Sequence, residues 1–223
     1  MKILAVETSS KICAVALAEN DKLIKEEILE DENTHSVKLM LLINKLLKET
    51  NTKLQDVDLF AVDKGPGSFT GIRIGIATIK AFMDATNKKG IGITSLETLA
   101  YNVEENGTVC SIIDARNDNV YYGVFEKIEN RIKNREKGFS NINVLLKYLK
   151  GLKKDIFFIG SGAIVHREII AQELKEEARF IENIDLNKLN ARNIAIAALN
   201  NKENAGEGNS IIPTYLRKSN AER

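Results

Sequence analysis

Residues 2–29 read KILAVETSSKICAVALAENDKLIKEEIL, and the fold prediction starts from this stretch. Lys2–Glu7, Ile12–Ala18 and Lys22–Leu29 are short runs rich in branched apolar residues, which is typical of strands. Short polar turns separate the runs, and strands joined by so few residues pair antiparallel. The stretch therefore predicts a three-stranded antiparallel meander at the start of the chain.

The pattern of apolar residues changes to a helical period after residue 33. From Thr34 to Lys48, apolar residues occupy nearly all sides of the predicted helix, which gives it more apolar surface than one buried stripe needs. A strand, a helix, a strand and a helix follow, at Asp58–Asp63, 68–85, Gly90–Thr94 and Ser95–Asn102.

A similar order of elements returns in the second half of the chain. We expect strands at Val109–Asp114 and Val120–Lys127, a helix and a strand within 139–158, and helices at Arg167–Glu177 and Ala191–Asn200. The sequence therefore predicts an α/β fold of two lobes that duplicate a β-β-β-α-β-α unit without residue-level repetition. The predicted divisions are an N-terminal lobe at 1–104, a second lobe at 105–204 and a tail at 205–223.

The composition favours a cytoplasmic protein. The formal net charge of the 223 residues is +1, so no global field would attract nucleic acid or an acidic substrate. Cys13 and Cys110 lie far apart in apolar runs, which predicts buried thiols in a reducing compartment and not a disulfide. The first apolar run is interrupted by Glu7 too soon for a signal peptide, and no run is long enough to span a bilayer.

A polar turn follows the first predicted strand. Its hydroxyls and backbone N–H groups are of the kind that cradles phosphate, so the candidate phosphate-binding residues are Thr8, Ser9, Ser10 and Lys11. The alternative is a hairpin turn whose side chains bond their own backbone. The sequence indicates no cofactor that the chain requires, and this turn is the place where ATP or ADP would bind.

The segment Gly65-Pro66-Gly67-Ser68-Phe69-Thr70-Gly71 is the most distinctive part of the chain. Its glycines permit a close backbone approach, and it precedes a helix N-terminus, where an anion is favoured. It lacks both the Gly-Lys-Ser/Thr ending of a nucleoside-triphosphate P-loop and the spacing of a dinucleotide fingerprint. An anion-binding loop and a structural turn are equally consistent with it.

The helix after this loop carries Gly71, Gly75 and Ile79 at four-residue spacing. Each glycine inside a helix costs roughly 1 kcal/mol relative to alanine, so the stripe indicates a flat groove for another helix. That helix belongs to this chain or to a partner, and the wide apolar surface at 34–48 favours a partner. The predicted interface uses His35, Leu39, Leu42, Leu46, Gly71, Gly75, Ile79 and Phe82.

Residues that carry chemistry are few. His35 and His166 each lack a second ligand at metal-binding spacing on the same helix, and no nucleophile elbow is visible. We therefore predict no catalytic residue and no metal ligand. The segment Arg131–Lys154 holds eight Lys and Arg residues against Glu136 alone, which is typical of an RNA-contacting patch or of a solvated face. We find no aromatic interleaving that supports base stacking, which favours the solvated face.

Together these segments resemble the TsaB (YeaZ) family, bacterial proteins for making threonylcarbamoyladenosine in tRNA. The resemblance spans nearly the whole chain and is weaker in the second half. Glu7 departs from the pattern, where aspartate is expected, and the longer acid alters any phosphate or magnesium contact there. The segments that carry the resemblance are Ile3–Ser10, His35–Ser36, Gly65–Gly75, Ser95–Ala100, Asp114–Arg116 and Tyr215–Arg217.

The resemblance implies an actin-like ATPase (ribonuclease H-like) fold and a binding role. The family is a degenerate paralogue of TsaD, which modifies adenosine at tRNA position 37 and carries a His-x-x-x-His metal motif. Ser95 and Leu99 stand at the positions that resemble these histidines, and leucine cannot bind a metal. The implied protein is a non-catalytic subunit that pairs with TsaD through the first two helices of the N-terminal lobe. The ATPase TsaE docks on that pair, and tRNA is reached through the complex.

Two enzymatic alternatives remain open. An actin-like nucleotide hydrolase would use Thr8–Lys11 and a magnesium-holding acid, for which Glu7, Asp63 and Asp114 are candidates. A glycoprotease-like metallopeptidase would need a metal site that the sequence does not offer. Alone, the chain is expected to form a homodimer through the same apolar face, and no membrane partner is expected.

Overall fold

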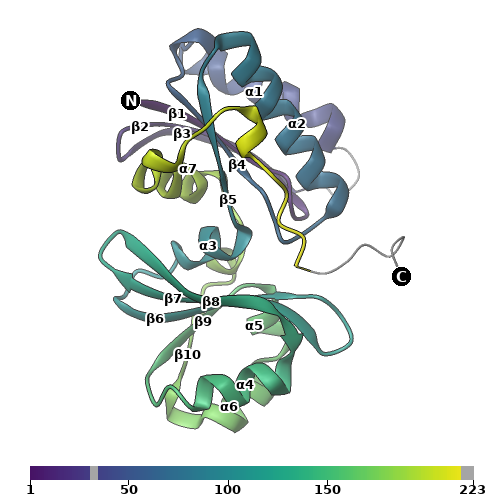
Figure 1. The fold of residues 1–223 in the computed structure, drawn as a ribbon, viewed down its shortest axis with the longest axis vertical. Helices are drawn as coiled ribbons and strands as arrows, with labels where there is room; N and C mark the ends of the chain where they lie inside the picture. The colour runs from purple at the N-terminus through teal and green to yellow at the C-terminus, as the bar shows by residue number, and fades with distance from the viewer. Residues whose placement is uncertain (31–34, 217–223) are drawn as a thin grey trace. The chain divides into compact units, whose positions relative to one another are not determined.

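The computed structural model of the chain describes residues 1–30 and 35–216, and it divides into two compact units (Figure 1). Unit 1 comprises Met1–Thr98 and Leu189–Thr214. Unit 2 comprises Leu99–Lys188 and the described residues after Thr214. None of the helices within the described ranges has both the length and the apolar character that a bilayer crossing requires.

The sheet of unit 1 begins with the predicted meander. Its strands are β1 (Lys2–Glu7), β2 (Ile12–Glu19), β3 (Lys22–Glu30), β4 (Leu59–Asp63) and β5 (Lys89–Ile93), in the order β3-β2-β1-β4-β5. β1 pairs antiparallel with β2 and parallel with β4, and Val6 is the register partner of Val62. The strands predicted for this half of the chain are confirmed.

Helices cover both faces of this sheet. α1 (His35–Glu49) and α2 (Phe69–Thr86) cover one face, and α7 (Ala191–Asn200) covers the other (Figure 1). Leu4 and Val6 lie in the core under α1 and α2, so alternation along β1 turns Ile3 and Ala5 toward α7. The remaining helical elements of this unit are short: η1 (Leu54–Asp56), α3 (Ser95–Ala100, which reaches the unit boundary), η4 (Lys202–Asn204) and η5 (Gly208–Ser210).

α7 and the segment after it belong to a different unit from the one that the sequence predicts. The sequence assigns them to a second lobe and a tail, whereas both pack in unit 1. The strands facing α7 present small alanines, and the buried Ala195 and Ala198 of α7 allow the helix to lie close against them. Farther on, Ile211 is buried in the unit 1 core. The long return to the first sheet was not visible as a sequence pattern.

The sheet of unit 2 repeats the topology of unit 1. Its order is β10-β9-β6-β7-β8, with antiparallel pairs β6–β7 and β7–β8 and parallel pairs β6–β9 and β9–β10. The predicted duplication is therefore confirmed. The elements are β6 (Gly107–Asp114), β7 (Asn119–Ile128), β8 (Arg131–Asn141), α4 (Ile142–Lys150), β9 (Ile156–Ile159), α5 (Ser161–Val165), α6 (Arg167–Leu174), η2 (Lys175–Glu177), β10 (Ala178–Phe180) and η3 (Ile184–Asn187).

The strand β8 is an element that the sequence prediction omits. In Arg131–Lys137 cations alternate with Ile132, Asn134 and Glu136, so the segment carries no continuous apolar face. β8 pairs only with β7 within the described residues, so it is an edge strand whose side chains meet solvent. Charged residues are common on such edges, where they disfavour pairing with another chain. A strand of this kind lacks the buried alternation on which the prediction depended.

Candidate functional site

The glycine-rich loop before α2 packs directly on the turn after β1. The Ser68 backbone N–H donates to the Ser9 carbonyl oxygen over 2.6 Å. A Cβ atom on Gly67 would lie 2.3 Å from that oxygen, and one on Gly71 would lie 1.8 Å from the Thr8 carbonyl oxygen. These glycines are therefore required for a close backbone approach inside the chain, which is the structural-turn interpretation of the segment.

The turn itself is bonded internally. The Thr8 hydroxyl donates to the Gly71 carbonyl oxygen (2.8 Å), and the Ser10 hydroxyl oxygen accepts from the Ile12 N–H (3.1 Å). Ser9 donates to Glu7 Oε1 from both its backbone N–H (2.8 Å) and its hydroxyl (2.9 Å). Thr8 and Ser9 are buried. Of the four candidate phosphate-binding residues, these two are thus closed off, and Lys11 alone is exposed.

A pair of buried carboxyl groups lies behind this turn. Glu7 ends β1 and Asp63 ends β4, and the parallel register sets the two ends side by side. Asp63 Oδ1 accepts from the Gly65 N–H (2.6 Å) and from the Ser95 hydroxyl (2.7 Å). Both carboxyl groups are inaccessible to solvent. Glu7 Oε2 and Asp63 Oδ2 receive no hydrogen bond from any described residue.

The pKa values of both carboxyl groups are raised in this arrangement. Burial raises the pKa of Glu7 well above its usual range, and the neighbouring Asp63 raises it further. Burial also raises the pKa of Asp63 to about 6, opposed by hydrogen bonds from Glu7 and Ser95. Both shifts favour the protonated form, so the two buried carboxyl groups hold a proton to a higher pH than exposed acids do. The sequence names both acids as candidate magnesium holders, but it does not reveal that they are buried beside each other.

The buried pair does not fit the role of a magnesium-holding acid for a nucleotide. Both carboxyl groups are enclosed in the core, with no exposed surface. The glycine-rich loop covers the turn where a phosphate would lie. Asp114, the third candidate, ends β6 in unit 2, where its Oδ1 lies 3.8 Å from His166 Nε2 and accepts from the Arg116 N–H. Within residues 1–30 and 35–216, no three His, Cys, Asp or Glu side chains gather as a metal site would require.

Most of the predicted interface residues are buried in the chain's own core. Leu39 and Leu46 of α1 and Ile79 of α2 are fully buried in the core of unit 1. Gly71 and Gly75 face β1 of the same chain, where a Cβ atom on Gly75 would lie 2.5 Å from Thr8 Oγ1. The prediction that these five contact a partner is wrong, because the helix groove is filled by the sheet. Leu42 and Phe82 are half-buried against the core, and the His35 side chain lies outside the described residues.

Other residues form the exposed surface of the two helices. Val37 and Leu41 on α1 expose 68% and 63% of their surface, and Met40 beside them is also exposed. On α2, Arg73 stacks over the exposed Phe69 ring at 3.8 Å, and Ala77 follows one turn later. Large exposed apolar side chains on adjacent helices are typical of an interaction surface. We refer to Val37, Met40, Leu41, Phe69, Arg73 and Ala77 as the α1–α2 face.

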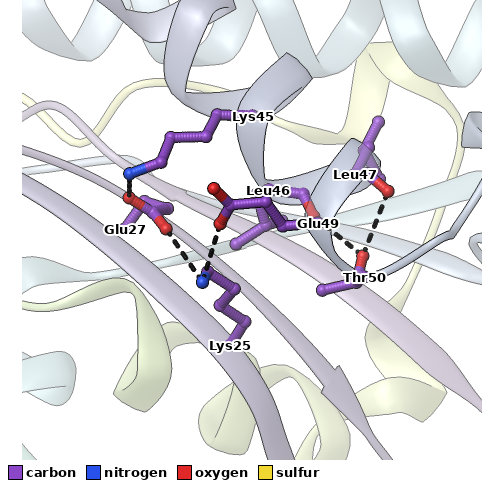
Figure 2. Close-up of polar contacts among 7 residues, drawn as sticks. All are labelled: Lys25, Glu27, Lys45, Leu46, Leu47, Glu49 and Thr50. Carbon is purple, nitrogen blue, oxygen red and sulfur yellow. Dashed lines mark hydrogen bonds and ion pairs between the residues drawn. The ribbon is translucent and has the colours of Figure 1, made fainter.

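The second half of α1 is fixed to β3 by ion pairs (Figure 2). Lys25 Nζ lies 3.3 Å from Glu27 Oε1 and 2.7 Å from Glu49 Oε2. Lys45 Nζ lies 2.6 Å from Glu27 Oε2, and the Thr50 hydroxyl donates to two carbonyls of the last helical turn. Partly exposed pairs of this kind contribute little stability, but they set the position of the helix. The apolar, exposed part of α1 is therefore its first half.

Comparison with known proteins identifies the family. A protein of Bacillus subtilis described as tRNA threonylcarbamoyladenosine biosynthesis protein TsaB is 31% identical over the whole of this chain and 96% of its own length. The chain belongs to the TsaB family. The TsaB protein of Escherichia coli is 33% identical over 59% of this chain and 58% of its own length. A family model described as TsaD, tRNA N6-adenosine threonylcarbamoyltransferase, matches residues 22–223.

Solved structures support the fold of the TsaB family. A Pseudomonas aeruginosa protein described as similar to peptidase YEAZ superposes with a TM-score of 0.80 at 23% identity, over 97% of this chain and 99% of its own. A Clostridium difficile activator of 2-hydroxyisocaproyl-CoA dehydratase, solved with bound ADPNP, superposes with a TM-score of 0.53 at 12% identity, over 91% of this chain and 96% of its own. At these identities the matches show the fold alone, and they confirm the two-lobed α/β architecture.

Ser95 and Leu99, the positions that resemble the metal motif of TsaD, are buried in this TsaB family member. Ser95 is buried, and its hydroxyl is engaged with Asp63 and lies 3.3 Å from the Ser9 hydroxyl oxygen. Leu99 is likewise buried. Membership of the TsaB family connects the chain to the biosynthesis of threonylcarbamoyladenosine in tRNA.

Proposed function

We propose that this chain is a non-catalytic subunit that binds TsaD through the α1–α2 face. The observation that carries the proposal is the exposure of Val37 and Leu41, with Met40 beside them, on the first half of α1. Burying such side chains gives roughly 1.5–3 kcal/mol each, so a monomer gains little by leaving them in water. The shared fold of the TsaD family model supports a paralogous partner that offers a similar pair of helices.

Docking on TsaD also sets the order of assembly. The ATPase TsaE joins the pair once it has formed, and tRNA is modified by the catalytic subunit. Without TsaD, two copies of this chain cover the α1–α2 face as a homodimer, because an apolar face can be self-complementary about a two-fold axis. The buried Thr8 and Ser9 and the buried Glu7–Asp63 pair support a role in which unit 1 supplies structure and surface.

Replacing Leu41 with aspartate is expected to abolish the complex with TsaD. The variant removes a central apolar contact and places a charge where water is excluded, which costs at least about 3 kcal/mol of binding, or more than about a hundredfold in affinity. The measurement is size-exclusion chromatography with light scattering of this chain mixed with the TsaD of the same cell. Leu41 is exposed, so the fold of the variant is expected to stay intact.

A matched control separates this effect from a general loss of surface apolarity. Ile184 in unit 2 exposes 68% of its surface, much as Val37 does, and Ile184→Asp is expected to leave the one-to-one complex unchanged. Co-elution of Leu41→Asp with TsaD at the affinity of the parent chain would show that the α1–α2 face is not the docking surface.

A further inference from the structure

Unit 2 carries a cluster of cations around one carboxylate. Arg135 Nη2 lies 3.5 Å and Lys154 Nζ 3.4 Å from Glu126 Oε1, which also accepts from the Thr108 hydroxyl (3.2 Å). Lys133 is the cross-strand register partner of Glu126, so the two side chains share one face of the sheet. Two cations contact Glu126 and a third lies across from it, while Glu136 adds a second acid to this face, so three cations stand against two carboxylates. We refer to Glu126, Lys133, Arg135 and Lys154 as the Glu126 cluster.

The surplus is not cancelled by the neighbouring acid that precedes β9. Asp155 follows Lys154 but pairs with Arg179, whose Nη2 lies 2.9 Å from Asp155 Oδ2. Side chains of Arg135 and Lys154 remain more than half exposed, at 55% and 57%. Exposed cations that are only partly neutralised attract polyanions, because counterions are released when phosphates replace them.

Aromatic rings extend the same face of the sheet. Alternation along β7 sets Tyr122 on the side of Glu126, which is the side that α4 covers. Gly138 is the β8 partner of Tyr122, and a Cβ atom there would lie only 3.0 Å from the Tyr122 hydroxyl oxygen, so the ring lies across the edge strand. Tyr148 on α4 is exposed as well. Tyr148 belongs to the basic run Arg131–Lys154 itself and Tyr122 comes from β7, so aromatic rings accompany these cations.

We propose that the Glu126 cluster binds the phosphate backbone of tRNA and that Tyr148 stacks on one of its bases. Lys133 and Arg135 flank Asn134 on β8, where a bulge at Arg135 interrupts the pairing with β7, and two cations this close on one strand suit neighbouring phosphates of one RNA strand. Tyrosine and cations on one surface are the combination with which proteins hold RNA without reading its sequence. The inference rests on the proposed function only for the identity of the RNA, since tRNA is the substrate in the name of the TsaB relatives.

The test is a titration of fluorescein-labelled tRNA with the full chain, read by anisotropy at salt concentrations from about 50 to about 200 mM. The Lys133→Gln, Arg135→Gln, Lys154→Gln triple variant is expected to bind at least about tenfold more weakly at the lowest salt. Its slope of log affinity against log salt is expected to fall by about 2, because each phosphate contact contributes about 0.7 to 0.9.

The control variant changes net charge by the same amount elsewhere. It replaces three exposed lysines of unit 1 with glutamine, Lys22, Lys89 and Lys202, and is expected to retain the affinity and slope of the parent chain. Equal weakening by both triple variants would reduce the effect to net charge and overturn the proposal. Parent-like binding by the Glu126-cluster variant would overturn it as well.

Two single variants are expected to change tRNA affinity in ways that damage to the fold would not. Glu126→Gln keeps an acceptor for the Thr108 hydroxyl but removes the competing charge, so tRNA is expected to bind about threefold more tightly. Tyr148→Ala is expected to weaken binding severalfold with an unchanged salt slope, since stacking releases no counterions. Weaker binding by Glu126→Gln would contradict the proposal.

The titration also shows whether the ligand is RNA or an acidic protein segment. It also tests this inference independently of the proposed function. Poly-glutamate is expected to compete poorly with tRNA, and equal competition that the Glu126-cluster variant abolishes would overturn the RNA assignment. Leu41→Asp is expected to bind tRNA as the parent does, because Leu41 belongs to unit 1 and the Glu126 cluster to unit 2. Failure of the tRNA titration therefore leaves TsaD docking untouched, and failure of docking leaves the titration interpretable.

Discussion

Replacing Gly71 with valine is expected to unfold unit 1, with a loss of more than about 3 kcal/mol in the free energy of unfolding. Even a single Cβ atom at this position would lie 1.8 Å from the Thr8 carbonyl oxygen, which belongs to the backbone and has no rotamer with which to move away. Relief requires α2 to shift away from β1, which would break the Thr8 hydroxyl bond to Gly71. Urea denaturation followed by circular dichroism measures the loss.

Ala77→Val is the matched control for this substitution. Ala77 lies on the exposed side of the same helix, so valine there costs only its lower helix propensity, about 0.5 kcal/mol. A Gly71→Val protein as stable as the Ala77→Val protein would show that α2 does not need the close approach to the turn after β1.

The same geometry rules out Gly75 as a probe of partner binding. Leucine at Gly75 would press on Thr8 Oγ1 and on Val62 Cγ2, since its Cβ atom would lie 2.5 Å from the first and 3.1 Å from the second. A helix stripe of glycines predicts Gly75→Leu to break a complex and spare the fold, whereas the structure predicts that the fold is damaged first. Leu41, which is exposed, is the residue that tests docking.

Raising the pH from about 4 to about 8 is expected to destabilise unit 1 through the Glu7–Asp63 pair. A carboxyl group whose pKa is higher in the folded than in the unfolded state favours folding at low pH, and that contribution is lost as the pH rises through the folded value. For Asp63 the loss falls between an unfolded pKa of about 4 and the folded value of about 6, and it is on the order of 3 kcal/mol. The loss from Glu7 follows at higher pH.

Glu7→Gln isolates this contribution. The carboxamide keeps the acceptor that Ser9 uses and donates permanently where protonated Glu7 donates, so stability is expected to depend less on pH and to exceed that of the parent chain at about pH 8. The exposed Glu203→Gln is the control and is expected to follow the parent curve. Free energies of unfolding from urea titrations at several pH values provide the measurement. Parallel curves for parent and Glu7→Gln would refute a raised pKa of Glu7 in the folded chain.

The sequence predicts elements well where burial is regular and poorly where it is not. The meander, α1 and α2 follow from periods that a buried strand or a half-buried helix imposes. β8 was missed because solvent reaches an edge strand and removes the alternation. The return of α7 and Ile211 to unit 1 depends on contacts between residues more than a hundred positions apart, which no local pattern encodes.

The sequence places the interface on α1 and α2, but five of its eight residues are buried in the chain's own core. When apolar residues surround a helix, their period does not indicate which side the sheet covers. The sequence therefore predicts Leu39 and Leu46 as interface residues, whereas Val37 and Leu41 are the exposed ones. Gly71 and Gly75 do mark a close approach, as their spacing predicts. The approaching backbone is β1 of the same chain, and only the packing of α2 on the sheet reveals this.

The contact between the glycine-rich loop and the turn after β1 has a kinetic consequence. Because the first turn of α2 is clamped to backbone atoms, Phe69 and Arg73 are held in place before any partner arrives. Association with a preformed surface needs little ordering, so the entropy cost of docking is small. Encounter should then proceed at an ordinary protein–protein rate, and substitutions on the α1–α2 face should change mainly the lifetime of the complex.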